Sequence, residues 1–324
     1  MELKTQRKLD KKDIAIIREL DFDARMSISA LARKVRVSKE VANYRLKKLL
    51  EDKVIKSFTA IIDPYIMGYQ LYSLRIKFKH VHEQKKKEII TWVQEHPQSA
   101  RIMSLGGKWN LAVFFWARNP SEFANIYDEF LLAFGKVIQR KSLTITIRIE
   151  HRPYNFLYDK MSEDSLSIGT VGNQEVDNKD KMILDVLSKN CRASLIDIAK
   201  ITDLTANAVK YRIRNLEEKR IIKGYSTILN DNFFGLAHYR VTLYLSDHSR
   251  KKEAKEYLRR QKDVIFITEL IGLGDIRFEM LCPSIMRVYE LIEKLNAETG
   301  DLVRDFDELI ILNEEDVFDY FPNE

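Results

Sequence analysis

The sequence predicts an α+β protein built from two tandem copies of one unit, each a winged helix-turn-helix followed by a ferredoxin-like βαββαβ domain. Its 324 residues suffice for two or more domains with their own cores. With only 11 glycines and 6 prolines, the chain is poor in turn formers, which favours a helix-rich or mixed α+β structure. The third observation is an internal repeat, which decides the whole arrangement.

A shift of 167 residues aligns the chain with itself. It places Tyr44-Arg45 on Tyr211-Arg212, and farther along it pairs Gly107 with Gly274. A register held over this distance predicts two copies of a unit of roughly 150 residues. The predicted segments are a winged helix at 1–62, a ferredoxin-like domain at 63–150, a linker at 151–175, a second winged helix at 176–230 and a second ferredoxin-like domain with an acidic end at 231–324.

Charge is distributed unevenly along the chain. The total is +6, but residues 1–62 carry +7 and residues 176–230 carry +4, whereas residues 231–324 carry −8. This asymmetry indicates an anionic partner for the two opening segments in particular. Two cysteines exclude a disulfide framework, the charged N-terminus lacks a signal-peptide core, and no apolar run approaches the ~18 residues of a membrane span, so a cytoplasmic protein is expected.

Each opening segment predicts three helices and a wing. Apolar residues recur at helical spacing behind each cap, and the short turn Arg36-Val37 before the third helix is typical of a helix-turn-helix. The β-rich runs 54–64 and 221–229 follow as wings. The predicted caps are Asp10, Ser27 and Ser38 in copy one, and Asp177, Ser194 and Thr205 in copy two.

The outward face of the third helix is polar and basic. Copy one places Lys39, Asn43 and Lys47 there at a spacing of four residues, and copy two places Lys210 and Arg214 there. Lys and Arg can neutralise phosphates or reach guanine, and Asn suits adenine, so this face is predicted to contact DNA. The alternative, an ordinary solvated helix face, stays open, above all in copy two. The predicted DNA-contacting residues are Ser38, Lys39, Asn43, Tyr44, Arg45, Lys47, Lys48, Thr205, Asn207, Lys210, Tyr211, Arg212 and Arg214.

These segments resemble the leucine-responsive regulatory protein/asparagine-operon regulator (Lrp/AsnC) family of transcription factors. The resemblance rests on Leu9-Asp10-x-x-Asp13, on Arg25-x-Ser27, and especially on Ala60-x-Ile62-Asp63-Pro64-x-x-x-Gly68-Tyr69. It covers both copies nearly end to end, although copy two loses the Asp-Pro pair. It implies a DNA-binding dimer-former whose second domain is a ferredoxin-like (ACT/RAM-like) module that responds to a small molecule.

The later segment of each copy reads as βαββαβ. The alternating run 71–78 predicts a strand, 85–95 a helix, and the last strands are expected at 143–149 and 309–312. The family resemblance implies an effector near the glycine turn between the central strands, although Arg277 favours an anionic group or an internal salt bridge. The alternative is that the glycines only permit a tight hairpin. The predicted effector-binding residues are Gly106, Gly107, Trp109, Asn110, Gly274, Asp275 and Arg277.

Catalytic signals are weak in this sequence. No Ser-His-Asp order, phosphate loop or Cys/His zinc spacing is present, so the prediction is no catalytic residue, no metal, no cofactor and no enzyme. One alternative is an enzyme like the siroheme decarboxylases, which are built on similar domains. It would need His and Arg residues converging on a pocket, and none of the six histidines falls in the glycine hairpin. Another is an interaction protein that does not bind DNA.

The sequence thus predicts a sequence-specific DNA-binding transcriptional regulator. Its partners are double-stranded DNA and an effector bound at the ferredoxin-like domains. Two helix-turn-helix modules in one chain can supply the paired recognition helices that dimers usually provide. The ferredoxin-like domains are expected to form an internal pseudo-dimer or a homodimer.

Overall fold

The computed structural model describes residues 8–80 and 82–315 and divides into two compact units. Met1–Ile62, Pro153–Asp164 and Val176–Leu236 form the winged-helix unit. Asp63–Arg152, Ser165–Glu175 and Ala237–Glu324 form the barrel unit. Each unit takes one domain from each copy, so the two copies pair domain by domain.

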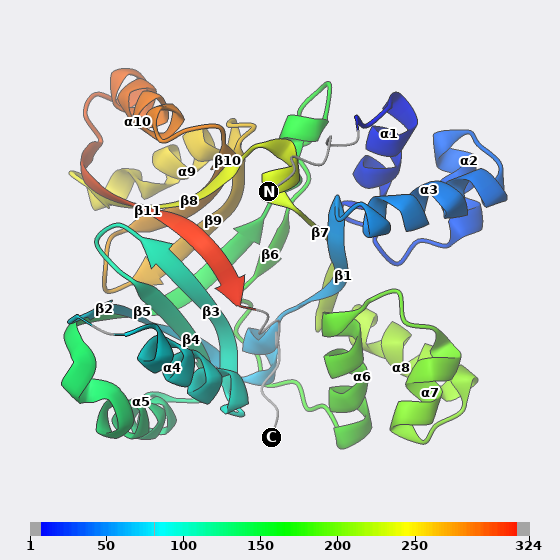
Figure 1. The fold of residues 1–324 in the computed structure, drawn as a ribbon, viewed down its shortest axis with the longest axis horizontal. Coiled ribbons are helices and arrows are strands. Elements are labelled where there is room, and N and C mark those ends of the chain that lie inside the picture. The colour runs from blue at the N-terminus through cyan, green and yellow to red at the C-terminus, as the bar shows by residue number, and fades with distance from the viewer. Residues whose placement is uncertain (1–7, 81, 316–324) are drawn as a thin grey trace. The chain divides into compact units, whose positions relative to one another are not determined.

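Both predicted winged helices are present, with all six predicted caps in place (Figure 1). Ser38 and Thr205 each accept a hydrogen bond from a backbone N–H in the first turn of the third helix. Copy one comprises α1 (Lys11–Leu20), α2 (Ile28–Val35), α3 (Lys39–Glu51) and β1 (Ile55–Ile62); copy two comprises α6 (Asn178–Lys189), α7 (Leu195–Thr202), α8 (Ala206–Glu218) and β7 (Ile222–Leu229).

The two winged helices pack through reciprocal contacts. Strands β1 and β7 pair antiparallel into a two-stranded ribbon. Arg25 donates to the carbonyl of Ala193 across this ribbon, and its counterpart Arg192 donates to the carbonyl of Met26. Each guanidinium also lies over an aromatic ring of the other copy. Reciprocity of this kind is the mark of a two-fold interface, here made within one chain.

The stretch predicted as a linker is folded. Tyr154 donates its backbone N–H to the buried carboxylate of Asp21, and the Tyr158 hydroxyl bonds to the same carboxylate. A short helix, η3 (Asn155–Leu157), lies between these tyrosines, and a short strand, β6 (Leu166–Ile168), pairs with β5. The linker was predicted from the polar composition after Ser162, whereas the tyrosines that contact Asp21 lie before it.

The barrel unit contains two ferredoxin-like modules with the predicted element order. The last strands are longer than predicted because each pairs with the other copy. Copy one comprises β2 (Gln70–Phe78), α4 (Glu83–Glu95), β3 (Ser99–Gly106), β4 (Leu111–Ala117), α5 (Pro120–Phe134) and β5 (Ile138–His151); copy two comprises β8 (Ala237–Leu245), α9 (Lys251–Arg259), β9 (Val264–Ile271), β10 (Ile276–Cys282), α10 (Met286–Thr299) and β11 (Val303–Glu315). Short 3₁₀ turns of this unit are η1 (Pro64–Met67), η2 (Gly135–Val137) and η5 (His248–Arg250), whereas η4 (Asp231–Phe234) lies in the winged-helix unit.

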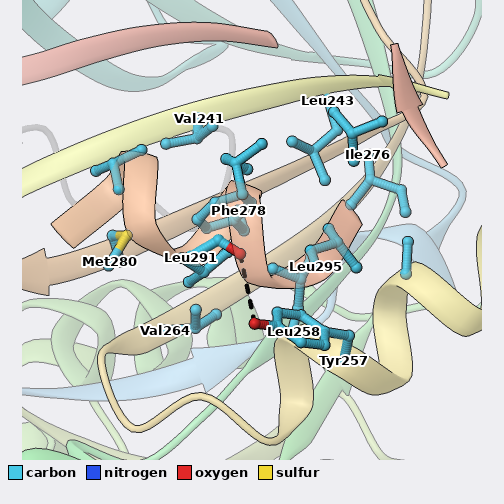
Figure 2. Packing of buried hydrophobic residues seen from close by; sticks show 14 of the residues in the cluster. Val241, Leu243, Tyr257, Leu258, Val264, Ile276, Phe278, Met280, Leu291 and Leu295 are labelled. Carbon is cyan, nitrogen blue, oxygen red and sulfur yellow. Dashed lines mark hydrogen bonds between the residues drawn. The ribbon is translucent and has the colours of Figure 1, made fainter. Parts of the chain in front are cut away.

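The sheet of the barrel unit closes on itself. Its order is β2-β4-β3-β11-β8-β10-β9-β5-β6, and a further pairing of β2 with β5 joins eight of these strands into a ring. In each copy, every second residue packs against the helices. Figure 2 shows this layer in copy two, where Phe278 and Met280 of β10 meet Leu291 and Leu295 of α10. The residues between them point to the inside of the ring.

Copy two is shorter than copy one before its glycine turn, which changes the alignment there. Gly107 (φ +113°) corresponds in the structure to Gly272 (φ +116°), and not to Gly274 as the ungapped repeat indicates. Likewise, the backbone N–H of Asn110 bonds to Ile76, and that of Asp275 bonds to Leu243, the counterpart of Ile76. Asn110 therefore corresponds to Asp275, and not to Arg277, on which the shift of 167 residues would place it.

Candidate DNA-contacting helices and ligand-binding residues

The predicted DNA-contacting face of copy one is open to solvent on α3. Lys39, Asn43 and Lys47 are all exposed, while Ala42, Leu46 and Leu49 of the same helix are buried. Tyr44 beside them is 67% exposed, a high fraction for an aromatic side chain. The helix thus presents lysines, an amide and an aromatic ring on one surface, the residue types that bind phosphates and base edges.

The corresponding face of copy two is open but carries less available charge. Asn207 and Lys210 are exposed, and Tyr211 is 73% exposed. Arg214 is exposed as well, but its Nε lies 2.7 Å from an oxygen of Glu218 one turn farther along α8. The pair offsets one of the two positive charges on the predicted face.

Two predicted DNA contacts have another role in the structure. Arg45 reaches back from α3 to Asp10 (2.8 Å) and to the buried Asp13 (2.9 Å) at the start of α1. Together with the backbone N–H of Asp13, Arg45 lowers the pKa of the Asp10 carboxyl. Arg212 forms the same bridge in copy two, to Asp177 (2.7 Å) and Asp180 (2.8 Å). These arginines tie the third helix to the first.

The remaining predicted residues of α3 and α8 lie at the helix ends. The side chains of Ser38 and Thr205 cap the N-termini of α3 and α8. Backbone N–H groups at such helix N-termini favour binding of a phosphate. Lys48 lies 3.6 Å from Glu51 and 3.4 Å from Asp52 at the other end of α3. Exposed pairs of this kind hold a lysine only weakly.

The glycine turn of copy one is a structural hairpin beside a pocket. The Asn110 side chain accepts the backbone N–H of Phe78 (3.0 Å), and Trp109 is buried, with its indole N–H facing no hydrogen-bond acceptor. A pocket of about 520 Å³ adjoins the hairpin. Its lining is Lys77, Phe78, Lys79, His80, Lys86, Asn110 and Gln139, so it is predominantly basic. Gly106 and Gly107 shape the turn beside it.

The predicted residues of copy two separate in the structure. Asp275 accepts the backbone N–H of Leu245 (2.8 Å) and binds His248 (3.0 Å) at the turn. Gly274 packs so closely on Thr242 that a Cβ atom would collide with it. Arg277 is fully buried instead, on the face of β10 that points into the ring of strands. The predicted effector-binding residues of copy two therefore do not form one site: Asp275 stabilises the hairpin, and Arg277 lies inside the barrel.

Sequence reasoning missed a buried polar cluster inside the barrel. Arg240 binds Glu279 (2.9 Å), and His238 binds the other oxygen of Glu279 (3.0 Å). Although burial opposes it, Arg240 and His238 hold the pKa of Glu279 well below its ordinary range. Arg75 is buried there too. The signal was present: charged residues alternate with large apolar ones in β2, β8 and β10.

Metal-binding clusters and membrane-spanning helices are both absent from the part of the chain that the structure describes. Within 8–80 and 82–315, no group of three or more His, Cys, Asp or Glu side chains is arranged to hold a metal ion. Of the helices in that same part of the chain, none combines the length and the apolar character needed to cross a bilayer.

The winged-helix unit defines the class of protein. The family model for winged helix-turn-helix DNA-binding domains matches residues 9–56 and again residues 176–223. These two matches cover the helices and wing starts of both copies. The chain is therefore a tandem winged helix-turn-helix protein.

Sequence relatives identify the family. The HTH-type transcriptional regulator LrpA of Pyrococcus abyssi is 37% identical over 101 residues, which are 31% of this chain and 70% of that protein. LrpA of Pyrococcus horikoshii is 34% identical over the same length and shares. This chain belongs to the Lrp/AsnC family of transcriptional regulators, as a tandem duplication.

Solved structures add a full-length likeness. The siroheme decarboxylase NirDL matches with a TM-score of 0.65 at 14% identity, covering 94% of this chain and 92% of that one. Its complex with an iron-uroporphyrin III analogue matches with a TM-score of 0.62 at 15% identity, covering 94% and 90%. The prediction that the chain is no enzyme is contradicted by this match, because an enzyme has the same fold from end to end.

Proposed function

We propose that this protein is a sequence-specific DNA-binding transcriptional regulator that uses α3 and α8 as paired recognition helices. The observation that carries the proposal is the exposed face of Lys39, Asn43 and Lys47 on a helix-turn-helix. Membership of the Lrp/AsnC family supports it. So does the reciprocal packing of the two winged helices, because a fixed pair of helix-turn-helix modules can read two half-sites.

Selection of bound sequences from a random pool of double-stranded DNA tests this proposal. The expected result is an enriched site of two half-sites. Because α3 and α8 carry different side chains, the half-sites should differ, giving an asymmetric site. Binding should weaken steeply with salt, since lysines release counterions from phosphates. Failure to enrich any sequence would contradict the proposal.

The effector part of the proposal concerns the barrel unit. We place a small-molecule effector in the pocket beside Asn110, because Lys77, Lys79 and Lys86 line it. Their charge favours an acidic compound. Screening acidic metabolites for a change in DNA affinity tests this, with K79A/K86A as the variant expected to lose the response while retaining DNA binding.

A second candidate function rests on the full-length likeness to NirDL. In this reading, the protein decarboxylates an acidic tetrapyrrole. Anaerobic incubation with siroheme, followed by chromatography of the pigments, tests it directly. A new decarboxylated pigment formed in proportion to protein would establish the activity. Unchanged siroheme would leave the likeness as one of fold alone.

A further inference from the structure

Two arginines inside the barrel have donors without acceptors. Arg75 on β2 is 1% exposed, and its Nε and Nη1 are buried with no hydrogen-bond partner. Arg277 on β10 is 0% exposed, and the same holds for its Nε and Nη2. Buried polar groups are almost always satisfied, and a buried cation is costly unless a counter-charge lies beside it. Four unsatisfied donors on two cations are therefore a signature of a missing acceptor.

The two guanidinium groups belong to one place in the barrel. The Nη2 of Arg75 donates to the hydroxyl of Thr242 on β8 (3.0 Å), which brings β2 and β8 together across the interior. Arg277 is the direct cross-strand partner of Thr242. Gly274 packs against Thr242 from the turn, so that residue is held in place. Arg75 and Arg277 thus approach each other over a fixed Thr242.

Positive charge is in excess at this place. The charged groups acting on Arg277 are Arg75, Arg240 and Glu279. Glu279 is already bonded to Arg240 and His238. Burial, and then the charge of Arg240, lower the pKa of Arg75 to about 9, which still leaves it charged at neutral pH. The buried carboxylate of Glu279 therefore lies among Arg75, Arg240 and Arg277, and the charge of Arg101 acts on it as well.

Arg152 shows how the same barrel unit satisfies an arginine that is purely structural. It is 3% exposed, and it donates to the backbone carbonyls of Leu258 (3.1 Å), Gln261 (3.0 Å) and Val264 (3.2 Å), with a further bond to that of Arg259. Backbone carbonyls thus accept hydrogen bonds from the Arg152 guanidinium. Arg75 and Arg277 have no such cradle, so their difference from Arg152 requires an explanation other than burial.

A cluster of three polar side chains, Lys108, Tyr244 and Asp307, lies close enough to Arg75 for its charge to act on that arginine. Lys108 of the glycine turn binds Asp307 (2.9 Å), and the Tyr244 hydroxyl donates to the same carboxylate (2.8 Å). Lys108 is 46% exposed and Asp307 17%, so this cluster lies between solvent and the interior. The charge of Asp307 also acts on Arg75.

We infer that the interior of the barrel is a binding site for a small oxyanion, held between Arg75 and Arg277 over Thr242. The ligand class is a phosphate, sulfate or compact carboxylate, because Nε and Nη2 of Arg277 form the fork of N–H donors that such oxygens accept, and Arg75 adds donors from Nε and Nη1. The site lies inside the ring of strands, apart from the pocket beside Asn110. Anion binding at this site does not depend on DNA binding. A bound anion should stabilise the barrel unit.

Thermal unfolding of the full chain in different salts tests the inference. At matched ionic strength, phosphate or sulfate should raise Tm above its value in chloride, by about 5 °C at concentrations about 100-fold above the dissociation constant. Because both guanidinium groups are buried, an anion held between them can also stay bound through purification. Ion chromatography after acid denaturation should then recover about one phosphate or sulfate per chain. An absence of both the Tm rise and the retained anion would overturn the inference.

Variants separate a ligand site from a structural role. R75M and R277M should lose the phosphate-dependent rise and the retained anion, while their Tm in chloride equals or exceeds that of the wild type, since an unpaired buried charge is removed. R152M is the matched control, expected to lower Tm and to keep the phosphate response. Loss of Tm in R75M and R277M together with an unchanged phosphate response would contradict the site. If either methionine variant fails to fold, R75K and R277K, which keep the charge, should weaken phosphate binding about tenfold.

Discussion

The two copies share a frame but differ in where they place charge. In the winged-helix unit, copy one exposes Lys39 and Lys47 on its third helix, whereas in copy two Glu218 pairs with Arg214. In the barrel, copy one contributes Arg75 to the interior, and copy two contributes Arg240, Arg277 and Glu279. Their counterparts in copy one are Ser73, Ala112 and Phe114. The two copies thus keep the same packing positions but differ in where charged side chains stand: copy one exposes more of them on its third helix, and copy two buries more of them in the barrel.

A single buried position breaks the symmetry most sharply. Burial raises the pKa of Asp21 to about 7. Hydrogen bonds from the backbone N–H of Tyr154 and the hydroxyl of Tyr158 oppose this rise, but burial outweighs them. At the corresponding place copy two carries Ser188, whose hydroxyl donates to the carbonyl of Asp185. Copy one therefore holds an acid where copy two holds a neutral group.

The largest effect is expected from D21N. Since the folded-state pKa of Asp21 is raised, its contribution to stability is full below the unfolded pKa and is lost as pH rises through about 7. This costs the wild type up to about 4 kcal/mol between pH 4 and pH 8. D21N should remove that loss and be more stable at pH 8. Urea unfolding across this pH range measures it, with the exposed E51Q expected to follow the wild-type profile. Equal pH profiles for D21N and wild type would refute the shift.

Next comes the contrast between the recognition helices. K39A/N43A/K47A should reduce affinity for the selected DNA by about 100-fold, because it removes two lysines that contact phosphates or bases and an amide suited to adenine. K210A/R214A should cost about tenfold, since Arg214 is already engaged by Glu218. Titration of labelled DNA measures both. The exposed lysines of the barrel unit, K252A/K262A, serve as the charge-matched control. Equal losses in the two helix variants would show that the copies contribute alike.

The helix ties give a smaller effect on stability. R45M leaves Asp13 buried without its guanidinium, and R212M does the same to Asp180. Each should destabilise the winged-helix unit by about 2 kcal/mol, a value below that for fully buried pairs because both arginines are partly exposed. R45M should cost more, since Asp13 is the more buried partner. The double variant R45M/D13N should recover part of the loss, and urea unfolding resolves the difference.

Local signals explain which features the sequence could predict. The caps Ser38 and Thr205 and the apolar spacing behind them lie within one helix, so the helix-turn-helix frame was readable in both copies. Arg45 was assigned to DNA because its partner Asp13 is 32 residues away. The interior site was missed for the same reason. Alternation in β10 shows that Arg277 and Phe278 face opposite sides, but only the closed ring of strands makes both sides interior.

The smallest effect probes whether copy two can be made more like copy one. E218Q releases Arg214 from its exposed ion pair, which such pairs hold by less than about 1 kcal/mol, so DNA affinity should rise about threefold. Removing a negative charge anywhere would attract DNA slightly, and the double variant R214A/E218Q separates the two causes. If the released guanidinium binds DNA, the gain vanishes when Arg214 is absent. A gain that persists in R214A/E218Q would instead assign it to general electrostatics. In that case α8 would contact DNA without sequence specificity, and α3 alone would determine which DNA sequence is bound.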